Sequence, residues 1–319
     1  MENAVQVEHL VKRFGSVNAV DDISFDVAQG EIFGILGPNG AGKTTTLEII
    51  EGLQKPTQGK ISVLGMDLAK DASKVKARIG VQIQSAAYFD YLSLEEILKL
   101  LGTFYPKSAP AGDLLDQVGL ADQAKMRLNQ LSGGQKQRFT VAASLVNLPD
   151  LVILDEPSTG LDPQARRSLW DLIRQINQQN ITIVLTTHYM EEAQALCQRL
   201  AIMDRGRLVA LDTPANLIGR LGASYTVKVV LNQPLSEDQV ASFNGKIELV
   251  QVPGPDNDNG DAPDGTAYLL RLNDHPSALA GMFEQIGENG SELEHLDITP
   301  VTLEDVFLEL TGNELSDQS

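Results

Sequence analysis

The segment Gly37-Pro-Asn-Gly-Ala-Gly-Lys-Thr44 constrains the fold of this chain more than any other feature, and it fits the pattern G-x-x-x-x-G-K-[ST]. An unbroken apolar run at 32–36 precedes it, and a helix-forming sequence begins near Lys43. An apolar run of that length is typical of a strand buried on both faces of a parallel sheet. Strands and helices then alternate through the apolar runs 151–154 and 181–185. The sequence therefore predicts an α/β fold built around this loop.

The glycine-rich segment can hold a polyphosphate, because glycines leave room for backbone N–H groups to approach one. We expect the N–H groups of Gly40, Gly42, Lys43 and Thr44 to surround the β-phosphate at the positive end of the following helix. The Lys43 side chain would reach the β- and γ-phosphates, and the Thr44 hydroxyl would bind Mg²⁺. The other loop residues assigned to ATP binding are Gly37, Pro38, Asn39, Ala41 and Thr45.

Two acids follow the apolar run 151–154, as Asp155-Glu156-Pro157. Ligand sites in open parallel sheets lie at the carboxyl ends of the strands. We expect Asp155 to hold Mg²⁺ through a water molecule and Glu156 to act as general base for the attacking water. A simple Asp-Glu-Pro turn would look the same in isolation, so this interpretation depends on the phosphate loop.

The segment Leu131-Ser132-Gly133-Gly134-Gln135-Lys136-Gln137-Arg138 opens a third site. A serine and two glycines at the start of a helix form an anion site, because bare N–H groups, a hydroxyl and the helix dipole converge there. With the phosphate loop before it and the acid pair after it, this segment resembles the signature sequence of ABC ATPases. The resemblance covers residues 1–220 and implies a parallel sheet with an antiparallel β subdomain and a helical subdomain.

The resemblance also implies roles for individual residues. Phe14 is similar to the aromatic residue that stacks on adenine, although a core phenylalanine remains the alternative. Gln84 matches the glutamine that senses Mg²⁺ and the attacking water, with Gln82 as the alternative in the same stretch. His188 matches the catalytic switch histidine that contacts the γ-phosphate. The loop 158–162, ending at Asp162, resembles the loop that crosses to the opposite subunit.

In the family, the signature of one subunit closes on the ATP held by the phosphate loop of the other. Ser132, Gly133, Gly134 and Gln135 would therefore act on the partner's nucleotide. The resemblance implies a dimer with two ATP molecules, for which two copies of this chain suffice. It also implies a separate integral-membrane permease, with this chain on the cytoplasmic side of the cell membrane.

Three classes of ABC protein compete for this sequence. Translation-type factors usually carry two ATPase units in one chain, whereas this chain has one of each motif. DNA-repair ATPases split their motifs around a long coiled coil, and no heptads occur here. A transporter ATPase is therefore favoured. The segment 298–312 resembles the end of ATPases from drug exporters with a separate permease, which favours export over the importer alternative.

A change of composition near residue 220 predicts two domains, an ATP-binding domain at 1–220 and an accessory domain at 221–319. The second is predicted to be α+β, with strands at 225–231, 246–252 and 266–272 and a helix at 277–286. Its 3 basic and 18 acidic residues argue against a nucleic-acid partner. No apolar run reaches the roughly 20 residues of a membrane-spanning helix, the N-terminus lacks a secretory signal, and the single cysteine excludes an internal disulfide.

Two surfaces are further hypotheses. We expect the permease to contact the stretch 84–105, with Tyr88, Phe89 and Tyr91 as candidates against ordinary core residues. Near the C-terminus, Thr302 can cap a helix with Asp305 at its third position, and Gly312 can end that helix. The apolar stripe of that helix either packs within its own domain or contacts a second subunit. Its members are Leu303, Val306, Phe307 and Leu310.

Overall fold

The computed structural model describes residues 2–82, 91–231, 250–252, 266–272 and 293–311. It groups the chain into two compact units. The first is Met1–Pro214 together with the C-terminal residues from Phe307, and the second is Ala215–Val306. The predicted domain division at residue 220 stays a prediction.

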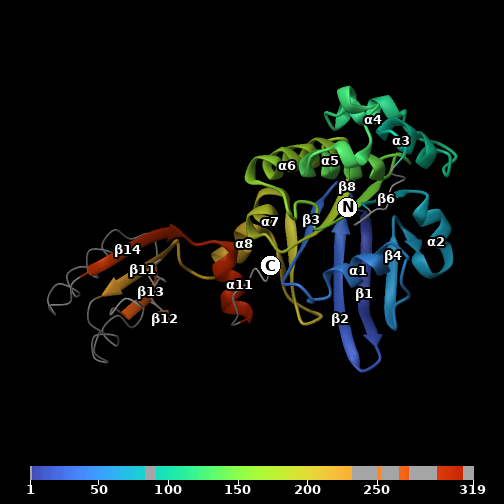
Figure 1. The fold of residues 1–319 in the computed structure, drawn as a ribbon. Helices are drawn as coiled ribbons and strands as arrows, with labels where there is room; N and C mark the ends of the chain where they lie inside the picture. Colours follow the sequence, from blue (N-terminus) through green and yellow to red (C-terminus); the bar gives the residue numbers. More distant parts are fainter. Residues whose placement is uncertain (1, 83–90, 232–249, 253–265, 273–292, 312–319) are drawn as a thin grey trace. The chain divides into compact units, whose positions relative to one another are not determined.

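The first unit contains a six-stranded sheet in the order β10-β9-β3-β8-β7-β6 (Figure 1). Every neighbouring pair from β9 to β6 is parallel, and β10 is antiparallel to β9. The strands are β3 (Ile32–Leu36), β6 (Ile79–Val81), β7 (Leu151–Asp155), β8 (Thr182–Thr187), β9 (Arg199–Asp204) and β10 (Arg207–Asp212). All residues of β3, β7 and β8 are buried, as apolar strands at the centre of a parallel sheet require. The predicted α/β fold is confirmed.

A second, antiparallel sheet has the order β2-β1-β4-β5. Its strands are β1 (Asn3–Phe14), β2 (Val17–Ala28), β4 (Gln58–Val63) and β5 (Met66–Asp67). The two sheets share one core, in which the ring of Phe25 in β2 stacks on Phe33 in β3 at 5.4 Å. Helix α1 (Lys43–Ile50) contributes Leu47, Ile49 and Ile50 to the same core. The phosphate loop is therefore fixed at both ends by buried structure.

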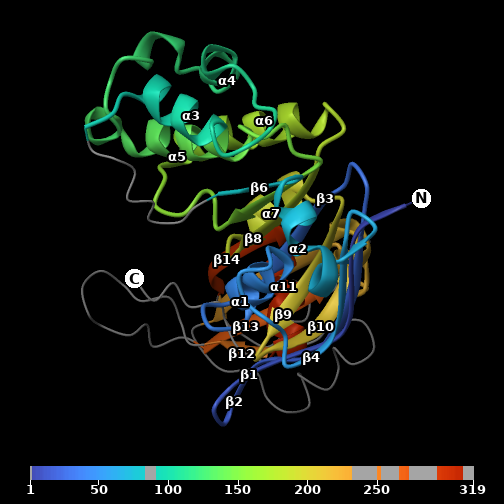
Figure 2. The same cartoon turned by 90° about the vertical axis from the view of Figure 1, so that its right-hand side faces the viewer.

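Four helices gather at one end of this unit, and Figures 1 and 2 show α3, α4 and α5 grouped there with α6 beside them. They are α3 (Leu94–Gly102), α4 (Ala111–Gln117), α5 (Gly133–Ser144) and α6 (Pro163–Asn177). The predicted capping box at the start of α3 is present, with Ser93 accepting from the Glu96 amide and Glu96 accepting from the Ser93 amide. The remaining helices of the described chain before residue 220 are α2 (Leu68–Lys76), η1 (Ala121–Gln123), η2 (Leu128–Gln130), α7 (Met190–Leu196) and α8 (Pro214–Gly219).

The second unit contains an antiparallel sheet in the order β12-β13-β11-β14. Its strands are β11 (Tyr225–Leu231), β12 (Val250–Val252), β13 (Thr266–Leu272) and β14 (Leu293–Pro300). The predicted strands 225–231 and 266–272 are confirmed, and 246–252 is described only at its last three residues. The predicted helix 277–286 lies outside the described residues. Strand β14 was not expected, because it is an edge strand with exposed or half-exposed residues throughout and so lacks apolar alternation.

Helix α11 (Leu303–Thr311) begins where its capping residues predict. The Thr302 hydroxyl accepts from the Glu304 amide at 3.3 Å, and Asp305 accepts from the Thr302 amide at 2.8 Å. Leu303, Val306 and Phe307 are buried, whereas Leu310 is exposed. Both alternatives for the apolar stripe stay predictions. Gly312 lies outside the described residues. Among the described helices, none is both long and apolar enough to cross a membrane.

Helix α1 ends in a buried carboxyl, Glu51, whose protonation must couple to folding. Burial, helped by the negative charges of Asp155 and Glu48, raises the pKa of Glu51 to about 7 from 4.5. The folded chain therefore holds a proton that the unfolded chain loses above pH 4.5. Between about pH 4.5 and 7, stability falls as the pH rises, because the carboxylate must then be buried with its charge.

We expect Glu51→Gln to remove this contribution to the pH dependence. At pH 5 the variant and the wild type should have similar stability. At pH 8 the variant should be more stable by up to roughly 3 kcal/mol, taking about 1.4 kcal/mol for each pKa unit. Urea unfolding at both pH values measures the difference, with Glu8→Gln, an exposed carboxyl, as the control. Equal stability of Glu51→Gln and the wild type at pH 8 would contradict the prediction.

Candidate functional site

The phosphate loop connects β3 to α1, and its glycines are required by close contacts. A Cβ atom at Gly37 would collide with the carbonyl oxygen of Met203, and one at Gly42 with that of Ala19. Gly42 also has φ +101°, a left-handed conformation that disfavours other residues. The loop therefore lies against β9 with its backbone uncovered, which is the geometry that a phosphate cradle needs.

The Lys43 side chain is buried, with 4% of its surface exposed, and it returns into the loop that it follows. Its Nζ atom donates to the carbonyl oxygens of Gly37 at 2.7 Å and Pro38 at 3.1 Å. It also forms an ion pair with Glu156 Oε1 at 3.1 Å. The loop from β3 and the acid pair after β7 thus meet at one cation.

Glu156 joins Lys43 to His188, because its second oxygen, Oε2, lies 3.1 Å from His188 Nδ1. The side chain of Thr159 also donates to Oε2, at 3.2 Å. Burial raises the pKa of Glu156, but Lys43 and His188 outweigh that effect and lower its pKa overall. The carboxyl is therefore ionised at neutral pH and able to accept a proton.

The backbone at Glu156 is strained, with φ +47° in a residue that is not glycine. Thr186 in β8 stabilises this conformation, because both its hydroxyl and its carbonyl oxygen accept from the Glu156 amide, at 3.0 and 3.2 Å. The same hydroxyl donates to Asp155. Thr186 is a site residue that the sequence reasoning missed. Its signal was the pair Thr186-Thr187, which follows the apolar residues Ile183-Val184-Leu185 at the carboxyl end of β8.

The oxygen donors available for a metal are those that Mg²⁺ prefers. The Asp155 carboxyl lies at the end of β7, and the Thr44 hydroxyl is exposed at the start of α1. The described residues contain no cluster of three His, Cys, Asp or Glu side chains that could hold a metal alone.

Phe14 and Gln84 are two further residues predicted to contact the nucleotide or its metal. Phe14 ends β1 with 48% of its surface exposed, so its ring is available for stacking, and Lys12 lies 4.8 Å from the ring centroid. Gln84 lies outside the described residues, as do Tyr88 and Phe89. Gln82, the alternative, is buried directly after β6, where its backbone N–H donates to the Ile153 carbonyl oxygen.

The signature residues form a separate pocket of about 370 Å³. Ser132 caps α5, and its capping box with Gln135 leaves Gly133 and Gly134 at the first turn. Asp162, which caps α6 by accepting from the Ala165 amide at 2.8 Å, lines the same pocket. No phosphate-loop residue lines it. One chain therefore presents the predicted nucleotide contacts as two separate surfaces.

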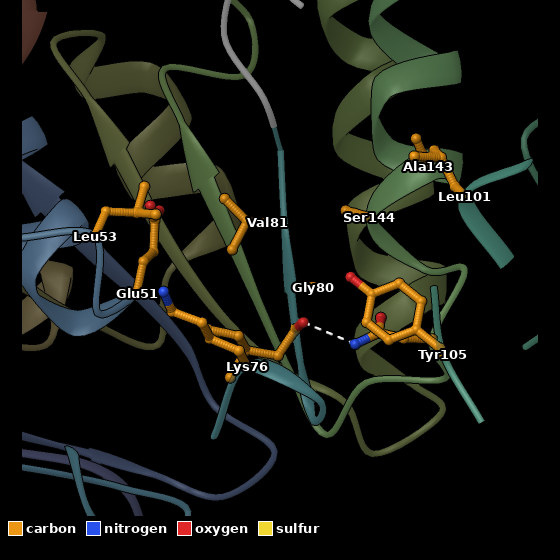
Figure 3. Close-up of a pocket in the computed structure, with 11 residues that line it drawn as sticks. Glu51, Leu53, Lys76, Gly80, Val81, Leu101, Tyr105, Ala143 and Ser144 are labelled. Carbon is orange, nitrogen blue, oxygen red and sulfur yellow. Dashed lines mark hydrogen bonds between the residues drawn. The ribbon is translucent and has the colours of Figure 1, made fainter. Parts of the chain in front are cut away.

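A second pocket, of about 410 Å³, lies beside β6. Figure 3 shows Glu51, Leu53 and Lys76 on one wall and Leu101, Tyr105 and Ala143 on the other. The Asn147 amide group donates to the Ile79 carbonyl oxygen at 2.8 Å at the base of this wall. The pocket thus joins the core around α1 to the helices α3 and α5.

Comparison with known proteins agrees with this geometry. A family model described as "ABC transporter" matches residues 20–159. The chain is 36% identical over 322 residues to Nod factor export ATP-binding protein I of Paraburkholderia xenovorans (strain LB400), covering 99% of both chains. It is 33% identical over 324 residues to linearmycin resistance ATP-binding protein LnrL of Bacillus subtilis (strain 168), covering 98% of this chain and 100% of that one.

A solved structure is similar over about two thirds of the chain. It is a dimeric ATP-binding cassette in a post-hydrolysis state, bound to ADP and phosphate, and it is 26% identical with a TM-score of 0.59. The match covers 66% of this chain and 98% of that one. The chain therefore belongs to the ABC transporter family, as one of its ATP-binding and ATP-hydrolysing subunits.

Proposed function

We propose that this chain binds ATP with Mg²⁺ and hydrolyses it to power export through a separate membrane permease. The observation that carries the proposal is the Lys43–Glu156–His188 cluster, in which the Lys43 ammonium and the His188 imidazole each lie 3.1 Å from an oxygen of the Glu156 carboxylate. Mg²⁺, held by Thr44, Gln84 and water on Asp155, would neutralise charge on the β- and γ-phosphates. Phe14 would stack on the adenine.

The roles proposed for these side chains give the hydrolytic step. The backbone N–H groups of the residues from Gly37 to Thr45 hold the phosphates, and Lys43 neutralises the γ-phosphate. Glu156 takes a proton from the attacking water, whose oxygen forms the new bond to the γ-phosphorus as the bond to the ADP oxygen breaks. His188 contacts the γ-phosphate from the end of β8 and orients Glu156 through Nδ1.

The second half of the site would come from another subunit. Ser132, Gly133, Gly134 and Gln135 lie on a different surface from the phosphate loop, so one chain alone does not enclose a nucleotide. ABC cassettes form dimers, and a dimer of this chain with itself would complete two sites, with Asp162 at each junction. Such a dimer would bind the cytoplasmic side of its permease. Relatives named for Nod factor export and linearmycin resistance support export over the importer and soluble alternatives.

The pocket beside β6 is our candidate for the permease contact. It adjoins the stretch 84–105 through Leu101 and Tyr105, and Leu53 on its opposite wall is 64% exposed. Tyr91 and Phe104 add exposed apolar surface to the same stretch, at 84% and 72%. A helical segment of the permease with an apolar face and a hydrogen-bond donor toward Glu51 would fit this surface.

Glu156→Gln should stop hydrolysis while preserving ATP binding. The amide keeps the shape of the side chain but cannot accept a proton, so we expect kcat to fall by about 10²- to 10⁴-fold. With ATP and Mg²⁺, gel filtration should then show a stable dimer. Glu191→Gln, a neighbouring exposed carboxyl, should keep the wild-type rate.

Lys43→Ala separates binding from catalysis in the same assay. Removing the buried ammonium should abolish tight ATP binding and therefore dimer formation.

If Glu156→Gln remained monomeric at saturating ATP, or turned over at the wild-type rate, the role proposed for Glu156 would be wrong.

The permease contact can be tested by cross-linking in the assembled complex. Leu53→Cys and Tyr105→Cys place thiols on opposite walls of the pocket, and the chain's own Cys197 is buried. We expect both to cross-link to the permease, and Val17→Cys, equally exposed in the antiparallel sheet, to give no product. An intact complex in which neither pocket thiol cross-links would exclude this contact.

A further inference from the structure

Two neighbouring helices begin at the loops that complete the site. Helix α6 starts after Asp162, which caps it, and α7 starts after Tyr189, the residue that follows His188. Both helices lie in the first unit, where they pack against each other. Their contact therefore joins the loop 158–162 to the switch histidine within one chain.

The first contact involves Arg166, in the first turn of α6. Its guanidinium carbon lies 4.1 Å from the centroid of the Tyr189 ring. The Tyr189 ring also packs against the His188 imidazole, with centroids 4.1 Å apart and planes tilted by 43°. The position of His188 is thus tied, through one aromatic ring, to the start of α6.

The second contact lies one turn further along both helices. Trp170 Nε1 donates to Glu192 Oε1 at 3.0 Å, and both side chains are buried. The spacing of four residues places Arg166 and Trp170 on one face of α6, while Tyr189 is the N-cap of α7 and Glu192 lies in its first turn. Two contacts at successive turns fix both the distance and the rotation of one helix against the other.

The loop 158–162 also reaches this helix contact through a buried polar side chain. Ser158 of the loop and Glu192 of α7 are both fully buried there. Burial raises the pKa of Glu192, and the side chains of Thr187, Ser158 and Arg166 face its carboxyl. Ser158 belongs to the loop 158–162 and Thr187 ends β8, so the Glu192 carboxyl of α7 lies beside side chains from both segments.

We propose that the paired contacts Arg166–Tyr189 and Trp170–Glu192 are a positioning element that couples His188 to the loop 158–162. This inference rests on the proposed function, in which His188 contacts the γ-phosphate and the loop crosses to the second subunit. Movement of His188 toward a phosphate then shifts the start of α6 and Asp162 with it. The γ-phosphate in one site is thereby sensed at the junction with the other.

Kinetics on the full-length chain can test this coupling. Arg166→Ala and Tyr189→Ala remove the first contact, whereas Tyr189→Phe keeps the ring and Arg167→Ala removes an exposed neighbouring cation. We expect the first two variants to lower kcat roughly 10- to 100-fold, as a misplaced catalytic group does, while KM for ATP changes less than about two-fold. Their Hill coefficients should fall toward 1. Tyr189→Phe and Arg167→Ala should behave as the wild type.

The contact between Trp170 and Glu192 provides an independent test. Glu192→Gln keeps an acceptor for Trp170 in a neutral side chain and should retain kcat. Trp170→Phe removes the indole donor together with part of the buried ring system and should lower kcat. Melting temperatures show whether each variant is folded, and Arg166→Ala, at a partly exposed residue, should melt with the wild type.

Three results would overturn the inference. The first is that Arg166→Ala and Arg167→Ala have the same kcat and the same Hill coefficient. The second is that Tyr189→Phe lowers kcat as much as Tyr189→Ala does. The third is that the wild type hydrolyses ATP without cooperativity. If the wild type hydrolysed no ATP, the proposed function itself would be wrong. Failure of the coupling and failure of the proposed function are therefore distinguishable.

Discussion

The burial of one ammonium group organises the site. Lys43 has almost no exposed surface, and a buried charge is tolerated only with a counter-charge and hydrogen bonds. The counter-charge comes from Glu156, at the end of a strand more than a hundred residues further along the chain, and the hydrogen bonds come from the loop's own carbonyl oxygens. A phosphate that enters the loop meets a cation already held in place, so little ordering is required on binding.

The parallel sheet makes this arrangement possible. Strands β3, β8 and β7 are neighbours in register, so their carboxyl ends meet at one edge. The phosphate loop follows the first, His188 the second and Glu156 the third. Thr186 in the middle strand binds both acids of the third, which explains how a strained backbone at Glu156 is maintained. The chemistry therefore depends on sheet register rather than on any local sequence.

Much of this site could be predicted from the sequence because its elements are local patterns. The apolar run of β3, the glycines of the loop and the capping boxes at Ser93 and Ser132 each depend on residues a few positions apart. The contacts of Thr186, Tyr189 and Arg166 could not be predicted, because they join segments whose proximity only the tertiary fold decides. Strand β14 was not predicted either, because an exposed edge strand has no alternation of apolar and polar residues.

Three glutamates show how the surroundings of a carboxyl decide its role. Glu51 and Glu192 are buried with too little compensating positive charge, so burial raises both pKa values. Glu156 is only partly buried and faces Lys43 and His188, so its pKa is lowered. The surroundings of Glu156 therefore favour its anion, which is the form that a general base requires. The neutral form of Glu192 can instead donate a hydrogen bond, which suits a carboxyl that joins helices rather than one that moves protons.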